Sequence, residues 1–174
     1  LRASLEVRDF DGVSSRFNEL EIVGSIPEQE GYLALLRGRM AQALGRDKDA
    51  LAFYRTASAS GDRPSASEAK LYEIELARKR DEITEEQALE QLETLQAMWR
   101  GDLIEVKTLR LLATMYERAG RYRDALLTAR MGTQLSPNSE PARQMQDDAA
   151  ALFNDLFNGA KADEMPPVQA LALF

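Results

Sequence analysis

Residues 106–139 read VKTLRLLATMYERAGRYRDALLTARMGTQLSPNS, and the spacing of their apolar side chains decides the fold. Within this stretch Val106, Leu109, Leu112 and Tyr116 follow one another at intervals of three or four positions. That interval places side chains on one face of an α-helix, whereas a half-buried strand would alternate every second residue. The first half of the stretch therefore predicts an amphipathic helix.

A second helix follows after a very short connection. Ala125 and Ala129 continue the helical spacing, and only residues 118–121 separate them from the first helix. Gly120 lies in that connection, where glycine readily takes the left-handed conformation that ends a helix. Pro137 cannot continue the second helix. Because so short a connection brings the two helices back along each other, the stretch predicts an antiparallel helical hairpin.

The hairpin recurs along the chain. RDKDAL at 46–51 matches RYRDAL at 121–126, which makes Ala50 and Ala125 equivalent. Val13 and Ala88 hold the same place in two further units, so the four positions are 37, 38 and 37 residues apart. A period of about 20 to 50 residues is the signature of a solenoid, in which each unit completes the core of its neighbour.

The helical spacing extends over the whole chain. The tail of one helix is expected at 1–8 with its partner helix at 10–24, and Met165-Pro166-Pro167 opens a last helix that the end of the sequence cuts short. The main predicted pairs are 27–44 with 47–59, 65–80 with 84–99, and 102–119 with 122–135, followed by a single helix at 139–158.

The segment 106–139 resembles one unit of the tetratricopeptide-repeat (TPR) family, whose repeat has about 34 residues. The residues that carry the resemblance, at the family's spacings, are Leu112-Ala113, Tyr116, Gly120, Tyr122, Ala125 and Pro137. The resemblance implies an all-α fold, a right-handed superhelix of antiparallel helix pairs, in one domain over 1–174. The implied units are 1–30 with a truncated first helix, 31–68, 69–105, 106–138, and 139–174 with a truncated last helix.

The other units depart from the family pattern. The unit from Gly31 has Ala41 where an aromatic residue is expected, and the unit from Ala69 has Leu76 at the small position and no glycine in its turn. Gly38, Leu76 and Ala113 each precede the second-helix alanine of their unit by 12 positions. The extra residues of the longer period are therefore expected between the units.

Composition excludes several classes of function. The 174 residues contain 22 Lys and Arg against 29 Asp and Glu, a net charge of −7, which disfavours nucleic-acid binding. No apolar run is long enough to span a membrane, so direct membrane insertion is not expected. The chain has neither His nor Cys, which removes imidazole bases, thiolate nucleophiles and the usual zinc ligands. We expect no metal, no cofactor and no enzymatic activity.

A hydrolase that uses carboxylates alone is the remaining enzymatic alternative. The pairs Glu85-Glu86 and Asp147-Asp148 are adjacent in sequence. Neighbouring residues of a helix point about 100° apart, so neither pair converges on one cleft. Solvated helix faces explain both pairs better.

The TPR resemblance also implies a binding site, because the first helices of such arrays line a concave groove. The fifteen groove positions of three units include six basic and three acidic residues, an excess that favours an acidic partner segment. The alternative is that these cations only solvate a helix face and pair with Glu73 or Glu117. The candidate peptide-binding residues are Arg39, Gln42, Lys70, Glu73, Arg80, Lys107, Arg110, Thr114 and Glu117.

The expected function is a non-enzymatic scaffold that binds a peptide or a partner helix in this groove. The alternative is a structural spacer within a longer TPR array, or a module that associates with itself through its truncated ends. Leu1 in place of an initiator Met and the apolar run Val168–Phe174 suggest such a longer parent. Without the native N-terminus the compartment stays open, with the cytoplasm slightly favoured and export still allowed.

Overall fold

The computed structural model describes residues 29–159, and this part of the chain is helical with short connections and no strand. The predicted all-α class is confirmed. The helices expected at 1–24 and after Met165 lie outside the described residues. The helices are α3 (Glu30–Ala43), α4 (Asp47–Ser58), α5 (Arg63–Lys79), α6 (Glu85–Met98), α7 (Leu103–Arg118), α8 (Tyr122–Leu135) and α9 (Glu140–Asn158).

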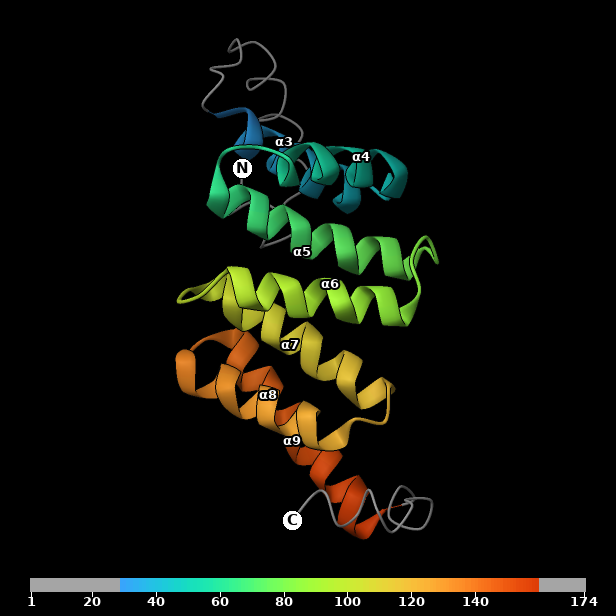
Figure 1. Ribbon diagram of the computed structural model, residues 1–174, viewed down its shortest axis with the longest axis vertical. Helices are drawn as coiled ribbons and strands as arrows, with labels where there is room; N and C mark the ends of the chain where they lie inside the picture. The colour runs from blue at the N-terminus through green and yellow to red at the C-terminus, as the bar shows by residue number, and fades with distance from the viewer. Residues whose placement is uncertain (1–28, 160–174) are drawn as a thin grey trace. The chain divides into compact units, whose positions relative to one another are not determined.

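Contacts within the chain divide it into two compact units, residues 1–84 and 85–174. The first unit contains α3, α4 and α5, and the second contains α6 to α9 (Figure 1). The predicted repeats 31–68 and 106–138 each fall within one unit. The predicted repeat 69–105 is divided, because α5 belongs to the first unit and α6 to the second. Each unit has a buried cluster of its own.

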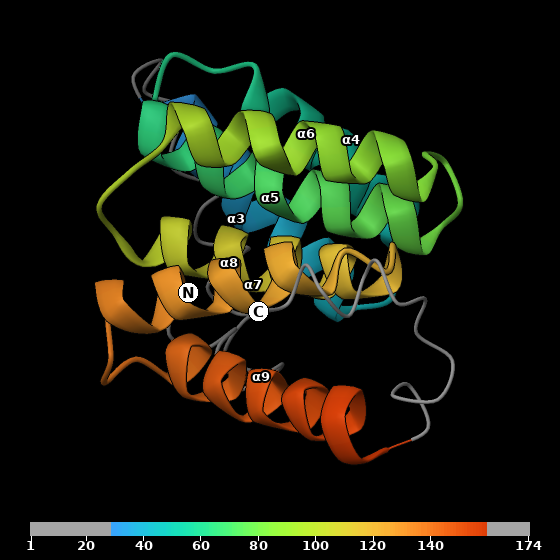
Figure 2. The same cartoon turned by 60° about the horizontal axis from the view of Figure 1, so that its bottom comes forward.

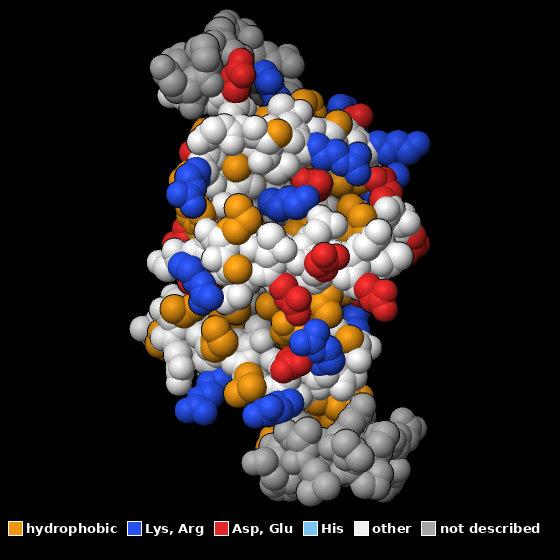
Figure 3. Space-filling model, in the orientation of Figure 1, with side chains coloured by type: hydrophobic (Ala, Val, Ile, Leu, Met, Phe, Trp, Pro, Cys, Tyr) orange, Lys and Arg blue, Asp and Glu red, His pale blue; other side chains and the backbone are white. Residues whose placement is uncertain are grey.

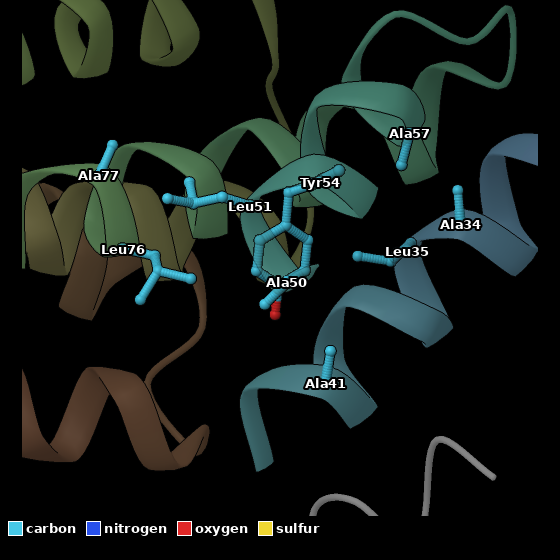
Figure 4. Packing of buried hydrophobic residues seen from close by; sticks show 10 residues of the cluster. Ala34, Leu35, Ala41, Ala50, Leu51, Tyr54, Ala57, Leu76 and Ala77 are labelled. Carbon is cyan, nitrogen blue, oxygen red and sulfur yellow. The ribbon is translucent and has the colours of Figure 1, made fainter. Parts of the chain in front are cut away.

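In the first unit α3, α4 and α5 pack on one another around Tyr54. The Tyr54 side chain is fully buried, and Leu35 from α3 points toward its ring (Figure 4). Gly38 on α3 lies directly against the ring, so that a Cβ atom there would lie 2.6 Å from two ring carbons. Small residues at the helix contact, Ala50 among them, let the backbones approach and leave room for the large ring.

In the second unit α7 is the central helix. It contacts α6, α8 and α9, and Figure 2 shows α9 alongside α7 and α8. Asp102 caps the start of α7, where its carboxylate accepts hydrogen bonds from the backbone N–H groups of Ile104 and Glu105. Ser139 caps α9 in the same way. Gly132 on α8 allows Met145 of α9 to pack against the α8 backbone.

The helices α3, α5 and α7 end in the same backbone arrangement. At the end of α3 the Arg46 N–H donates to the Ala41 carbonyl at 2.8 Å, and the Gly45 N–H donates to the Gln42 carbonyl at 3.0 Å. This is the Schellman motif, which needs one residue with positive φ. The residue with positive φ is Gly45 after α3 (73°), Asp81 after α5 (57°) and Gly120 after α7 (71°). After α5 the backbone N–H groups of Glu82 and Asp81 donate to the carbonyls of Ala77 and Arg78. After α7 the N–H groups of Arg121 and Gly120 donate to the carbonyls of Tyr116 and Glu117.

These three turns correct the register predicted for α5. The helices α4 and α8 begin two residues after their glycine, whereas α6 begins four residues after Asp81. Two of the extra residues therefore lie in the connection between α5 and α6. Counted back from the turn, the residue equivalent to Gly38 and Ala113 is Ile74, and the predicted equivalence of Leu76 is wrong by two positions.

Candidate binding groove

The second unit contains a groove of about 370 Å³ between α7, α8 and α9. Three of the predicted binding residues, Arg110, Thr114 and Glu117, lie together in its wall. The remaining lining residues are Ala113 of α7, Ala125, Leu126 and Ala129 of α8, and Met145, Asp148, Ala149, Ala151, Leu152 and Asp155 of α9.

The helical repeat explains why these side chains meet. Arg110, Thr114 and Glu117 are four and three positions apart, so α7 presents them on one face. The floor includes several small side chains, among them the buried Ala125 and Ala129 of α8. Because alanine fills little space beyond its backbone, α7, α8 and α9 pack closely and still leave a hollow at the surface.

The charges of the groove differ from the expectation. Among its lining residues one cation, Arg110, stands against three carboxylates, on Glu117, Asp148 and Asp155. The predicted excess of basic residues therefore does not hold for this groove. The groove positions predicted from the sequence lie only on helices that match α3, α5 and α7, whereas α9 supplies two of the carboxylates.

Arg110, Asp148 and Thr114 make only weak or local contacts beside the groove. The Arg110 guanidinium Nε lies 4.0 Å from an Asp148 carboxylate oxygen, and both side chains are about half exposed or more. An ion pair so exposed contributes about 0 to 1 kcal/mol. The Thr114 hydroxyl donates to the Arg110 backbone carbonyl at 3.2 Å and keeps its acceptor capacity. The groove therefore offers charged groups that a ligand can engage.

The candidate residues of α3 make contacts inside the first unit. The Arg39 guanidinium lies 5.5 Å from the centre of the Tyr72 ring, a cation–π arrangement. The Gln42 side-chain oxygen accepts a hydrogen bond of 2.6 Å from the Tyr54 hydroxyl. Burial raises the pKa of Tyr54 well above its usual range, which keeps this hydroxyl a donor. Gln42 therefore fixes the central aromatic ring of the unit.

The candidate residues in and after α5 also face partners within the first unit. Glu73 accepts a hydrogen bond of 2.9 Å from Ser58 of α4 and lies 3.3 Å from the Lys70 ammonium group. Arg80 lies in the turn after the helix and pairs with Glu82 at 3.0 Å. Counted from the Schellman turns, the α5 residues that match the predicted α7 residues Lys107, Arg110, Thr114 and Glu117 are Glu68, Leu71, Glu75 and Arg78.

Lys107 is the last candidate residue. It lies on α7, is partly buried, and is absent from the lining of the groove. The predicted residues thus include three that line the α7 wall of the groove and none that line the α9 wall. The helical spacing of Asp148, Leu152 and Asp155 is the signal that would have revealed the second wall.

A polar cluster supports the C-terminal end of α7. The Tyr116 hydroxyl donates to Glu93 of α6 at 2.8 Å, and the Arg121 guanidinium lies 4.4 Å from the centre of the Tyr116 ring. Arg121 also pairs with Asp124 at 2.8 Å. Burial and the hydrogen bond to Glu93 raise the pKa of Tyr116 to about 12. The cluster fixes the turn between α7 and α8, next to the Glu117 end of the groove.

The described residues also bear on membrane insertion, metal binding and surface charge. Within residues 29–159 no helix is long and apolar enough to cross a membrane. The same residues contain no group of three or more acidic side chains arranged to hold a metal ion. On the face drawn in Figure 3, acidic and basic side chains are interspersed within each unit.

Comparison of the chain with protein-family models, with curated proteins and with solved structures found no match in any of the three.

Proposed function

We propose that this chain is a non-enzymatic interaction module that binds a peptide segment or a partner helix in the groove between α7, α8 and α9. The observation that carries the proposal is the meeting of Arg110, Thr114 and Glu117 over a floor of small and apolar side chains. Clefts that combine an apolar floor with a few placed polar groups are the usual form of a binding site.

The architecture we propose is a TPR-like right-handed superhelix. The three Schellman turns support a repeated unit, because they end successive first helices with the same hydrogen bonds. The hairpins α3–α4 and α7–α8 have connections of equal length. In such an array the first helices line the inner face, and the groove beside α7 belongs to that face.

The proposal of a non-enzymatic role rests on the side chains themselves. The whole sequence lacks His and Cys, the commonest general base and the strongest common nucleophile. The groove carboxylate of Asp148 is exposed and lies beside Arg110. Such an exposed carboxylate differs from the buried carboxyl groups that carry out acid–base catalysis in enzymes.

A peptide-display selection tests the proposal. The chain is presented to a random peptide library, and selected peptides are measured against two variants by fluorescence anisotropy. Ala151→Trp fills the groove from an exposed lining position, and Ala150→Trp places the same side chain at the adjacent exposed position outside the lining. Matching circular dichroism spectra establish that both variants fold.

We expect Ala151→Trp to weaken the selected peptides by about tenfold or more, a loss of about 1.4 kcal/mol, and Ala150→Trp to leave their affinity unchanged. Selected peptides that bind both variants like the parent chain would place the interaction elsewhere. A selection that yields no binding peptide would contradict the proposed function.

One observation favours the alternative of self-association. Leu127, Met131 and Leu135 are exposed and lie four positions apart, so they form an apolar stripe along α8. If this stripe joins two copies, Leu127→Gln with Met131→Gln will reduce the mass measured by light scattering. A parent chain that stays monomeric at high concentration rules the alternative out. The apolar run Val168–Phe174, also expected to drive association, lies outside the described residues.

A further inference from the structure

We infer that the partner segment of this groove is an amphipathic helix with an apolar stripe and a Lys or Arg side chain directed to the Glu117–Asp155 end. The inference rests on the proposed function, because it names the chemical class of the ligand for the same groove. Its basis is the way charge is distributed along the two walls.

The helices α7 and α9, which form the two walls of the groove, run in the same direction. Short connections make α8 antiparallel to both α7 and α9, so α7 and α9 are parallel and in contact. Arg110 on α7 lies across from Asp148 on α9, with 4.0 Å between their charged groups. Glu117 and Asp155 each follow seven positions later. Seven residues of helix advance about 10.5 Å and return to the same face.

The groove therefore has two electrostatically different ends. At the Arg110–Asp148 end the opposite charges largely cancel. At the other end two carboxylates, Glu117 and Asp155, line the groove with no cation among the lining residues. Asp155 forms no ion pair with any residue from 29 to 159. The field at this end favours a positively charged group on the ligand.

The floor between the two ends is apolar. Ala113, Ala129, Met145 and Leu152 contribute to it, and the hollow of about 370 Å³ has room for branched aliphatic side chains. A ligand that matches both features carries Leu at positions i and i+3 and Lys at i+7. On a helix these positions share one face and span the same distance as Asp148 to Asp155.

Three synthetic helical peptides of otherwise equal sequence test the inference. The first carries Leu at i and i+3 and Lys at i+7. In the second peptide Lys stands at i+5, where it points about 140° away from the Leu at i. The third carries Glu at i+7. Binding to the full chain is measured by fluorescence anisotropy at low and at high salt.

We expect the first peptide to bind about fivefold or more tightly than the second, and the Glu peptide to bind more weakly still. High salt should reduce the advantage of the first peptide because it screens the charges. Asp155→Asn should remove most of that advantage. Asp147→Asn removes the same charge from an exposed α9 position outside the groove lining and should change affinity by less than about twofold.

The outcomes separate the inference from the proposed function. Stronger binding by the Glu peptide, blocked by Ala151→Trp, would overturn the inference and leave the groove as the site. Library-selected peptides that lack Lys and Arg, and whose binding is blocked by Ala151→Trp, would also overturn the inference and leave the groove as the site. Equal binding of the three peptides, unaffected by Ala151→Trp, would count against both.

Discussion

Gly38 on α3 lies directly against the Tyr54 ring. Its missing side chain leaves the space that the ring fills, and a Cβ atom would lie 2.6 Å from two ring carbons. Gly38→Ala must displace a fully buried aromatic ring. We expect the free energy of unfolding, measured by urea denaturation, to fall by about 1 to 3 kcal/mol.

Gly61→Ala is the matched control, because a Cβ atom there meets nothing within 4 Å and the residue is exposed. This variant should be neutral or slightly stabilising, by at most about 1 kcal/mol, since alanine restricts the unfolded chain. Equal losses in the two variants would contradict the close contact with Tyr54.

Tyr116 makes stability depend on pH in the alkaline range. Its pKa rises from an ordinary 10 to about 12 because the ring is buried and the hydroxyl donates to Glu93. A pKa raised on folding means that the neutral phenol stabilises the fold. This contribution is complete below pH 10 and is lost as the pH rises through about 12.

Tyr116→Phe should lower the free energy of unfolding at neutral pH by about 0.5 to 1.5 kcal/mol, the net worth of one hydrogen bond. Between pH 10 and 12 it should also lose less stability than the parent chain, with Tyr54 still contributing to the remaining loss. Urea titrations at a series of pH values give both quantities. Parallel curves for the two proteins would show that the Tyr116 hydroxyl is not the group concerned.

At the scale of elements, the three Schellman turns show how a helix end depends on one residue. Gly45 and Gly120 take positive φ without a Cβ penalty, whereas Asp81 takes it at 57° with a side chain. A left-handed conformation costs an L-residue about 1 kcal/mol or more, and aspartate tolerates it better than most. The turn after α5 therefore carries strain that the other two lack.

We predict that Asp81→Gly stabilises the chain by up to about 1 kcal/mol, and that Gly120→Ala destabilises it by about 1 to 2 kcal/mol. Nothing surrounds either Gly45 or Gly120 within 4 Å of an added Cβ atom, so backbone conformation alone causes the loss. Thermal unfolding measures both changes. Destabilisation by Asp81→Gly would show that the aspartate side chain matters more than the strain.

The sequence was informative about elements and less so about their register. The predicted helices at 102–119 and 122–135 match α7 and α8 within one residue at every end. The reason is local: Asp102, Gly120 and Pro137 mark those ends by their own chemistry. The offset in α5 escaped prediction because Asp81 performs the part of a turn glycine without being one.

The groove residues also divide into those that the sequence predicts and those that depend on how the helices pack. Arg110, Thr114 and Glu117 are predicted from the groove positions that the TPR resemblance implies, and their helical spacing places them on one face of α7. Asp148 and Asp155 were missed because their role depends on α9 packing parallel to α7, which is tertiary information. The middle residues Lys70 and Glu73 were assigned in a register that the turn after α5 does not keep.

At the scale of the whole molecule, the chain combines two compact units of helices with a net charge of −7. In the second unit two carboxylates, Glu117 and Asp155, line one end of the groove. Charge at such a rim affects the rate and specificity of association more than its strength, while the apolar floor supplies affinity. We therefore expect the carboxylates to determine which ligand is recognised and the apolar floor to determine how long it stays bound.

An NMR titration of the isotope-labelled chain with a library-selected peptide tests the central claim, groove binding, most directly. The account predicts that the amide signals that move are concentrated at Ala113, Thr114 and Ala129 and on the α9 wall, and that Ala151→Trp suppresses these shifts. Shifts centred on the apolar stripe of Leu127, Met131 and Leu135, with the groove signals unchanged, would contradict it.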